Sequence, residues 1–246
     1  MQGYVLKIAY KGTNYCGWQV QPGKTTVQAV VQSACEAVFG CKVDVTGCSR
    51  TDSGVHAKGF VALVSGNGLP DIPVLSLPLA INTKLPEDIS VLEASVAKDG
   101  FHPRYGAKGK EYVYTVHNSR LRDPFTADTA WQFQRRIDES IADMLCKEFV
   151  GRHDFTAFMA SGGQQKTTVK TVNFLNVTTD ENKIVIEINA DGFLYNMVRI
   201  IAGTLVYAGV GKLDPKEIPD IIESGDRVRA GITAPPQGLC LKKVFY

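Results

Sequence analysis

The sequence predicts an α+β fold in which two similar halves build a mixed, largely antiparallel central sheet flanked by helices. Segments whose apolar residues alternate, as in strands, are interspersed with segments of helical apolar spacing. Each half of the chain has the order strand, helix, strands. Hairpins and short links outnumber the long crossovers that parallel strands require. The boundary signal lies near residues 101–108, so we expect two domains, 1–105 and 106–246, without a flexible linker between them.

In the first half, the segment from Tyr4 to Tyr10 alternates and predicts a strand. A helix is expected from Thr25 or Thr26 up to Gly40, because the apolar residues between them recur at spacings of three and four. Thr25 followed by Gln28 fits a capping box, and Gly40 suits a helix end. The other elements expected here are strands at 42–45 and 59–64 with a polar loop at 48–58, a short helix at 75–82 and a strand at 89–96.

The second half repeats this alternation. Glu111 to His117 predicts a strand, and Asp138 begins a helix that ends at Gly151. The other elements expected here are a hairpin of strands 173–179 and 183–189, a helix at 193–208, a helix that starts at Asp214-Pro215, and a closing strand at 239–245.

The composition is that of an ordinary folded protein and excludes disorder, collagen and coiled coil. The 246 residues are 44% hydrophobic and 21% charged, and 27 Lys and Arg against 25 Asp and Glu give a net charge of +2. The six cysteines lack zinc-site spacing and the four histidines are scattered, so we expect reduced thiols and no metal. The first residues do not resemble a signal peptide and no apolar run is long enough to span a membrane, so we expect a cytoplasmic protein without a membrane partner.

The most unusual stretch is the loop at 47–57, which places Arg50, Asp52, Ser53 and His56 between two apolar strands. One interpretation is a turn, in which Asp52 accepts backbone hydrogen bonds. A second makes Asp52 a nucleophile or general base, because a guanidinium within ~4–6 Å lowers the pKa of a carboxyl and keeps it ionised. A third, a Ser/His hydrolase built on Ser53 and His56, has no nucleophile-elbow motif to support it.

The segment from Arg50 to Ala57 closely resembles the G-R-T-D-A-G-V-H-A loop of the TruA family of tRNA pseudouridine synthases. Resemblance continues along the whole chain in ordered motifs. These are Y-K-G and Y-C-G-W-Q-V-Q at 10–21, T-V-Q at 26–28, N-T-K-L-P-E-D-I at 82–89, F-H-P-R-Y at 101–105, K-E-Y-V-Y at 110–114, G-R-H-D-F-T-A-F at 151–158, G-F-L-Y-N-M-V-R at 192–199, and G-I-T-A-P with G-L at 231–239. Ser49 departs from the family, which has Gly before this arginine, and a glycine there can serve a special backbone angle.

The resemblance implies the pseudouridine synthase fold, with two ferredoxin-like halves, and a cofactor-free isomerisation in which uracil is detached from its ribose and rejoined through carbon. The family's nucleophilic aspartate falls on Asp52, which attacks sugar or base or accepts a proton. Its active-site tyrosine falls on Tyr112, for base stacking or proton relay, although core packing is the ordinary role of a strand tyrosine. Arg199 matches the basic residue that pairs with the aspartate, and Leu239 matches an apolar residue of the uracil pocket.

The resemblance also implies an RNA substrate. Arg50 is expected to contact RNA or to fill the gap left when the target nucleotide flips out. Phosphate contacts are expected from the nearby basic residues, namely His56, Lys58, Arg104, Lys108 and Lys110. Trp18 fits the core better than a stacking platform. With so modest a net charge, the positive charge must be local, with acids such as Glu217, Asp220 and Glu223 on an outer helix.

Members of this family act as homodimers on uridines 38, 39 and 40 of the tRNA anticodon stem–loop, and the same is implied here. Two alternatives stay open. One is a non-catalytic RNA-binding module, against which the joint presence of Asp52, Tyr112 and Arg199 argues. The other is a related synthase that acts on other tRNA positions or another RNA.

Overall fold

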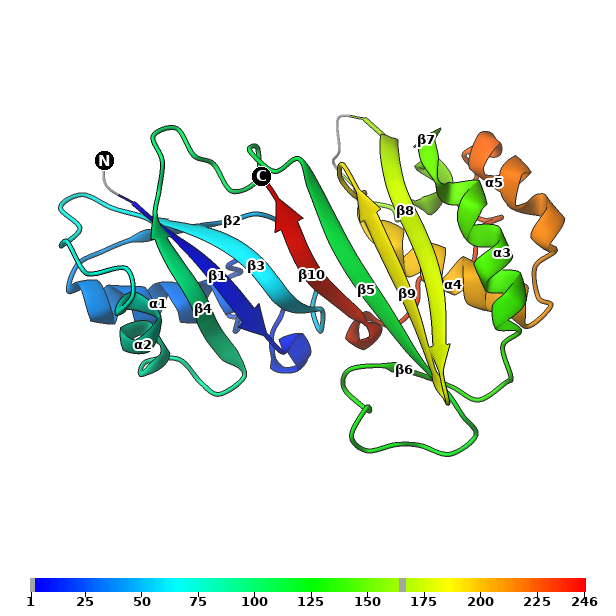
Figure 1. Ribbon diagram of the computed structural model, residues 1–246, viewed down its shortest axis with the longest axis horizontal. Helices are drawn as coiled ribbons and strands as arrows, with labels where there is room; N and C mark the ends of the chain where they lie inside the picture. The colour runs from blue at the N-terminus through cyan, green and yellow to red at the C-terminus, as the bar shows by residue number, and fades with distance from the viewer. Residues whose placement is uncertain (1–2, 164–166) are drawn as a thin grey trace. The chain divides into compact units, whose positions relative to one another are not determined.

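The computed structural model describes residues 3–163 and 167–246. The chain forms two compact units (Figure 1). Unit 1 comprises Met1–Lys108 together with Leu241–Tyr246, and unit 2 comprises Gly109–Cys240.

Unit 1 has the element order βαββαβ, which is that of a ferredoxin-like fold. Its elements are β1 (Tyr4–Tyr10), the 3-10 turn η1 (Gly12–Asn14), α1 (Val27–Phe39), β2 (Asp44–Gly47), β3 (His56–Ser65), α2 (Leu77–Asn82) and β4 (Ile89–Val96). The sheet order is β4-β1-β3, and both β2 and β10 (Leu239–Phe245) pair with β3. Strand pairs β1/β3, β1/β4 and β2/β3 are all antiparallel.

The core of unit 1 lies between this sheet and α1. Alternate residues of β1 are buried, as the alternating sequence predicts, and Tyr4 stacks on Phe39 of α1 with ring centroids 5.5 Å apart. The helix begins with Thr26 as its N-cap, whose hydroxyl accepts a hydrogen bond from Ala29 N at 3.4 Å, and ends at the left-handed Gly40. The capping box expected from Thr25 is wrong, because the Gln28 side chain instead donates to Val45 O at 2.8 Å.

Unit 2 follows a similar order with additional short elements. These are β5 (Gly109–Asn118), β6 (Trp131–Phe133), α3 (Glu139–Phe149), β7 (Gly151–Asp154), η2 (Thr156–Phe158), β8 (Val169–Asp180), β9 (Lys183–Ala190), α4 (Met197–Gly209), η3 (Pro215–Glu217), α5 (Ile218–Ser224) and η4 (Pro236–Gly238). Its strands lie in the order β5-β9-β8-β7 with antiparallel pairing, and β6 adds to β5 in parallel. The expected α+β class with a mixed, largely antiparallel sheet is therefore confirmed.

Several expected boundaries differ from the structure, among them the strand expected at 42–45, which lies at Asp44–Gly47. Strand β3 begins at His56, inside the loop predicted at 48–58, because its first residues pair with the end of β1. The apolar helix begins at Met197 and not at residue 193, because Asn196 adopts a left-handed conformation with φ 61°. Asp214 caps the next helical segment as expected and accepts a hydrogen bond from Lys216 N at 3.0 Å, but the first turn is the 3-10 turn η3 and the α-helix begins at Ile218. The short strands β6 and β7 were not predicted, since three or four residues carry too little periodicity.

None of the six cysteines, all of them described by the structure, forms a disulfide. Within the described ranges, no helix is long and apolar enough to cross a membrane, and no group of three or more His, Cys, Asp or Glu side chains is placed to hold a metal ion.

Candidate active site

Asp52 lies half-buried in unit 1, on the loop that joins β2 to β3. The neighbouring Thr51 anchors this loop from both its backbone and its side chain. Its carbonyl oxygen accepts a hydrogen bond from Trp18 N at 3.1 Å, and its hydroxyl lies 2.9 Å from the Tyr10 hydroxyl. Within the loop, Val55 N donates to Asp52 O at 3.1 Å. The aspartate therefore stands on a loop whose backbone is fixed against the segment that follows β1.

Two glycines permit this close approach. A β-carbon on Gly12 would collide with the Val55 carbonyl, and one on Gly17 would collide with the Thr51 carbonyl. Gly17 also has φ 80°, which disfavours any other residue. Both glycines belong to the motifs at 10–21, so those motifs serve to seat the Asp52 loop.

His56 has a structural contact that the sequence did not indicate. Its side chain is only 6% exposed, and its Nδ1 accepts a hydrogen bond from Gly12 N at 2.9 Å. The imidazole thereby ties the first residue of β3 to the turn after β1. The phosphate contact expected for His56 stays a prediction.

Two questions raised by the loop sequence have structural answers. The Ser53 hydroxyl donates to Tyr15 O at 3.1 Å, so its proton is directed to a carbonyl and not to an imidazole, which argues against a Ser/His hydrolase. Ser49 is not among the residues with positive φ, so its backbone conformation does not require the glycine that the family has there.

In unit 2, Tyr112 and Tyr114 share one face of β5. Tyr112 is 6% exposed, and its ring meets the Phe193 ring edge-on at 5.1 Å. Tyr114 is fully buried, and its hydroxyl donates to Pro235 O at 2.8 Å. Burial raises the pKa of Tyr114, while the positive charge of Arg199 acts in the opposite direction.

Arg199 lies in the first turn of α4, and two hydrogen bonds orient its guanidinium. Its Nε donates to Ala234 O at 2.7 Å, and its Nη1 donates to the Asn196 side-chain oxygen at 2.8 Å. Asn196 is one of two non-glycine residues with positive φ in the described ranges, so a strained residue positions the arginine. Asn196 was not predicted as a site residue, although asparagine is among the residues that tolerate this conformation best.

Leu239 is 7% exposed and begins β10 directly after η4. The preceding Gly238 packs on β5, since a β-carbon there would lie 2.6 Å from Tyr114 Cζ. Unit 2 thus brings Arg199, Tyr114 and the segment 234–238 before Leu239 together. Asp52 and Arg199 belong to different units, and their ion pair stays a prediction.

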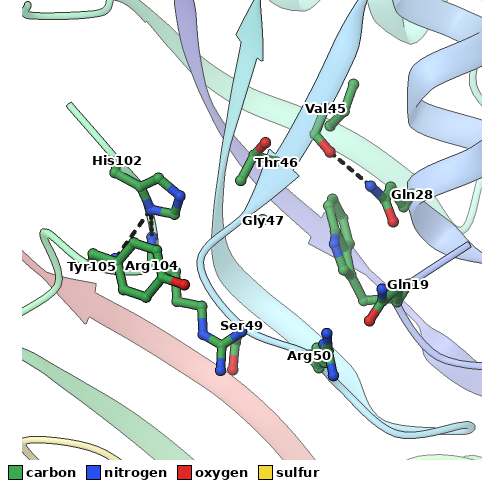
Figure 2. Close-up of a pocket in the computed structure, with 11 residues that line it drawn as sticks. Gln19, Gln28, Val45, Thr46, Gly47, Ser49, Arg50, His102, Arg104 and Tyr105 are labelled. Carbon is green, nitrogen blue, oxygen red and sulfur yellow. Dashed lines mark hydrogen bonds between the residues drawn. The ribbon is translucent and has the colours of Figure 1, made fainter. Parts of the chain in front are cut away.

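The expected basic contacts differ in their surroundings. Arg50, Lys58, Arg104 and Lys108 of unit 1 are exposed, whereas Lys110 of unit 2 is half-buried on β5. Two of them share a pocket in unit 1 with a volume of about 260 Å³ (Figure 2). Figure 2 shows His102, Arg104 and Tyr105 on one side of it and Gln19, Gln28 and Arg50 on the other.

Comparison with known proteins agrees with the sequence motifs. A family model described as tRNA pseudouridine synthase matches residues 7–106 and 145–246. "tRNA pseudouridine synthase A 2" of Clostridium perfringens is 44% identical over 246 residues and covers 100% of both chains. Two proteins named "tRNA pseudouridine synthase A", from Geotalea daltonii and a Thermoanaerobacter species, are 43% and 45% identical with the same full coverage.

Proposed function

Because the chain belongs to the tRNA pseudouridine synthase family, we propose that it isomerises uridine to pseudouridine at positions 38, 39 and 40 of the tRNA anticodon stem–loop. The reaction breaks the bond between uracil N1 and ribose C1′ and joins C5 to C1′; C5 loses its proton, and N1 takes up a proton in place of the broken bond. Asp52 acts as nucleophile, and no cofactor takes part.

The observation that carries this proposal is the anchoring of the loop on which Asp52 lies. Its loop is fixed by Thr51 and by close contacts at Gly12 and Gly17, so the backbone that carries the carboxylate is held in place before substrate arrives. Such preorganisation favours an attacking group, because little ordering is left for the reaction itself. A mere turn has no need of so many contacts from a separate segment.

Unit 2 supplies the remaining groups of the proposed site. Arg199 pairs with the Asp52 carboxylate and keeps it ionised. The hydrogen bonds of Arg199 to Ala234 O and to the Asn196 side chain support this role, because they hold the guanidinium in one orientation. Tyr112 stacks on the uracil or relays a proton, and Leu239 lines the uracil pocket.

The substrate is held by positive charge that is local. Arg50 contacts the RNA or fills the gap left by the flipped uridine, and the phosphate contacts come from His56, Lys58, Arg104, Lys108 and Lys110. The chain acts in the cytoplasm as a homodimer, which doubles the basic surface offered to one tRNA. Residues 1–105 carry the catalytic loop, and 106–246 complete the RNA cleft.

The test is release of tritium from unmodified tRNA that carries 5-tritiated uridine. We expect release by the natural protein, none by Asp52→Ala, and undiminished tRNA binding by that variant. Ser53→Ala is the matched control, because it removes a neighbouring polar side chain and restores the residue usual in the family. Transfer RNAs with uridine at only one of positions 38, 39 and 40 show which of these positions the protein modifies.

Two outcomes would overturn the proposal. A natural protein that binds tRNA and releases no tritium would be an RNA-binding module. Release only from uridines outside positions 38–40 would make it a synthase of different specificity.

A further inference from the structure

The pocket of unit 1 has a positive lining in which two of the proposed RNA-binding residues, Arg50 and Arg104, lie beside an exposed aromatic ring. Its wall contains Arg50, Arg104 and His102, together with the polar side chains of Gln19, Gln28, Thr46 and Ser49. Among its eleven lining residues, all in the described part of the chain, there is no carboxylate. Such a lining selects an anion.

Two guanidiniums are available to that anion. Arg50 and Arg104 are both exposed, and neither forms an ion pair with a carboxylate in the ranges that the structure describes. Guanidinium groups bind phosphate oxygens with paired hydrogen bonds, which favours a phosphate group over a simple halide.

An aromatic ring stands beside these cations. Tyr105 is 80% exposed. The centroid of its ring lies 4.4 Å from the centroid of the His102 ring and 6.0 Å from the Arg104 guanidinium carbon. Exposed aromatic rings next to Arg are the surfaces on which proteins stack unpaired nucleic-acid bases. A volume of about 260 Å³ is below the range of pockets for drug-sized ligands, so it suits one base and not a larger cofactor.

The loop that presents Tyr105 is held rigid. His102 Nδ1 accepts hydrogen bonds from both Arg104 N and Tyr105 N at 3.1 Å, as the dashed lines of Figure 2 show. The Tyr246 hydroxyl donates to Pro103 O at 2.7 Å, which anchors the loop to the C-terminal segment of unit 1. A rigid platform binds better than a mobile one, because less conformational entropy is lost.

The opposite wall is equally fixed. The Gln28 side chain donates to Val45 O at 2.8 Å and accepts from Val20 N at 3.0 Å. The buried Trp18 packs so closely on Gly47 that a β-carbon there would lie 2.6 Å from the indole nitrogen. Trp18 is therefore part of the wall, while Tyr105 is the ring open to a ligand.

We propose that this pocket binds a second nucleotide of the RNA, an unpaired one that lies near the reacting uridine. Its base stacks on Tyr105, and its phosphate lies between Arg50 and Arg104. The nucleotide is near the reacting one because Arg50 precedes Asp52 by only two residues, which span at most about 7 Å of backbone. The proposal rests on the proposed function, since it takes RNA as the substrate.

The pocket contributes to specificity. A base inside a duplex is stacked on both faces, so only an unpaired nucleotide can offer a face to Tyr105. The protein thereby distinguishes a stem with an adjoining loop from a continuous helix.

The test compares Tyr105→Ala, Tyr105→Phe and Leu79→Ala in the tritium-release assay. For Tyr105→Ala we expect KM to rise about 5- to 150-fold, the effect of losing one stacked base, with kcat within about twofold of the natural protein. Tyr105→Phe keeps the aromatic ring, so its KM should equal that of the natural protein. Leu79→Ala truncates another exposed side chain of unit 1, on α2, and leaves KM unchanged.

A binding measurement separates this proposal from the proposed function. Stem–loop RNAs carry the fluorescent base 2-aminopurine at one unpaired position each, and stacking on Tyr105 quenches it. We expect quenching at one position, lost in Tyr105→Ala, even if the natural protein releases no tritium. Arg104→Ala lowers the slope of binding against salt by about 0.7, as expected for one phosphate contact on a single strand, whereas Tyr105→Ala does not. Unchanged KM and unchanged quenching in Tyr105→Ala would overturn the proposal that this pocket binds a nucleotide and would leave the isomerase proposal intact.

Discussion

Replacement of Asn196 by alanine and by glycine separates the contribution of its backbone to stability from the contribution of its side chain to the position of Arg199. Its backbone has φ 61° and ψ 8°, and its side-chain oxygen accepts a hydrogen bond from Arg199 Nη1 at 2.8 Å. Both variants lose the hydrogen bond. Only alanine also has to adopt the left-handed conformation with a β-carbon, which glycine enters freely.

The magnitudes follow from these two differences. The left-handed conformation costs alanine about 1–2 kcal/mol, and the greater flexibility of unfolded glycine offsets about 0.5–1 kcal/mol of that. Asn196→Ala should therefore unfold with a free energy about 1 kcal/mol below that of Asn196→Gly. For a chain of this size that corresponds to a melting temperature about 2–4 °C lower.

Activity should respond differently. A hydrogen bond to a charged group contributes about 1.5–3 kcal/mol, and we take the lower end because Arg199 is half-exposed and keeps its bond to Ala234 O. Both variants should then lose about tenfold in the rate of tritium release. Urea unfolding and the tritium assay measure the two effects. Equal stability of the two variants would refute the backbone argument, and full activity of Asn196→Gly would refute the positioning of Arg199.

Two further predictions concern the packing of unit 1 and the thiols. Gly17→Ala should be at least about 2 kcal/mol less stable in urea unfolding than Gly23→Ala, and it should lose tritium release. Both glycines have positive φ, but only at Gly17 would a β-carbon collide with backbone atoms. Equal stability of the two variants would show that the Asp52 loop has room to move. Burial, with a smaller effect of neighbouring acids, raises the pKa of Cys35 and Cys146 to about 12, so at pH 8 only about one in 10⁴ of these thiols is ionised. Their reaction with Ellman's reagent in the folded protein should be slow and should rise about tenfold per pH unit below pH 12, and fast labelling of either thiol before unfolding would contradict their burial.

The sequence predicted those elements whose signals lie within the element itself. Helix α1 carries its cap at Thr26 and its stop at Gly40, and the hairpin of β8 and β9 shows two apolar runs around a polar turn. Helix α4 was predicted four residues too early, because its start depends on the left-handed Asn196, which apolar spacing does not reveal.

The candidate site divides in the same way. Residue spacing alone left Asp52 between a turn and a nucleophile, and only the resemblance to a family favoured the second. The hydrogen bond from Gly12 N to His56 joins segments that are distant in sequence, and the exposure of Tyr105 depends on how the chain packs around it. No local sequence pattern predicts either feature. Such roles become visible only when the segments are placed in space.

The membership of residues 241–246 in unit 1 has a consequence for biosynthesis. Lys108 N donates to Phe245 O at 2.8 Å, and β10 pairs with β3. A ribosome that adds about 5–20 residues per second therefore finishes all of unit 2 before the last strand of unit 1 emerges, a delay on the order of ten seconds. During that interval part of the β3 edge has no partner strand, which makes the nascent chain vulnerable to mispairing. Cutting the chain after residue 108 would make this transient state permanent.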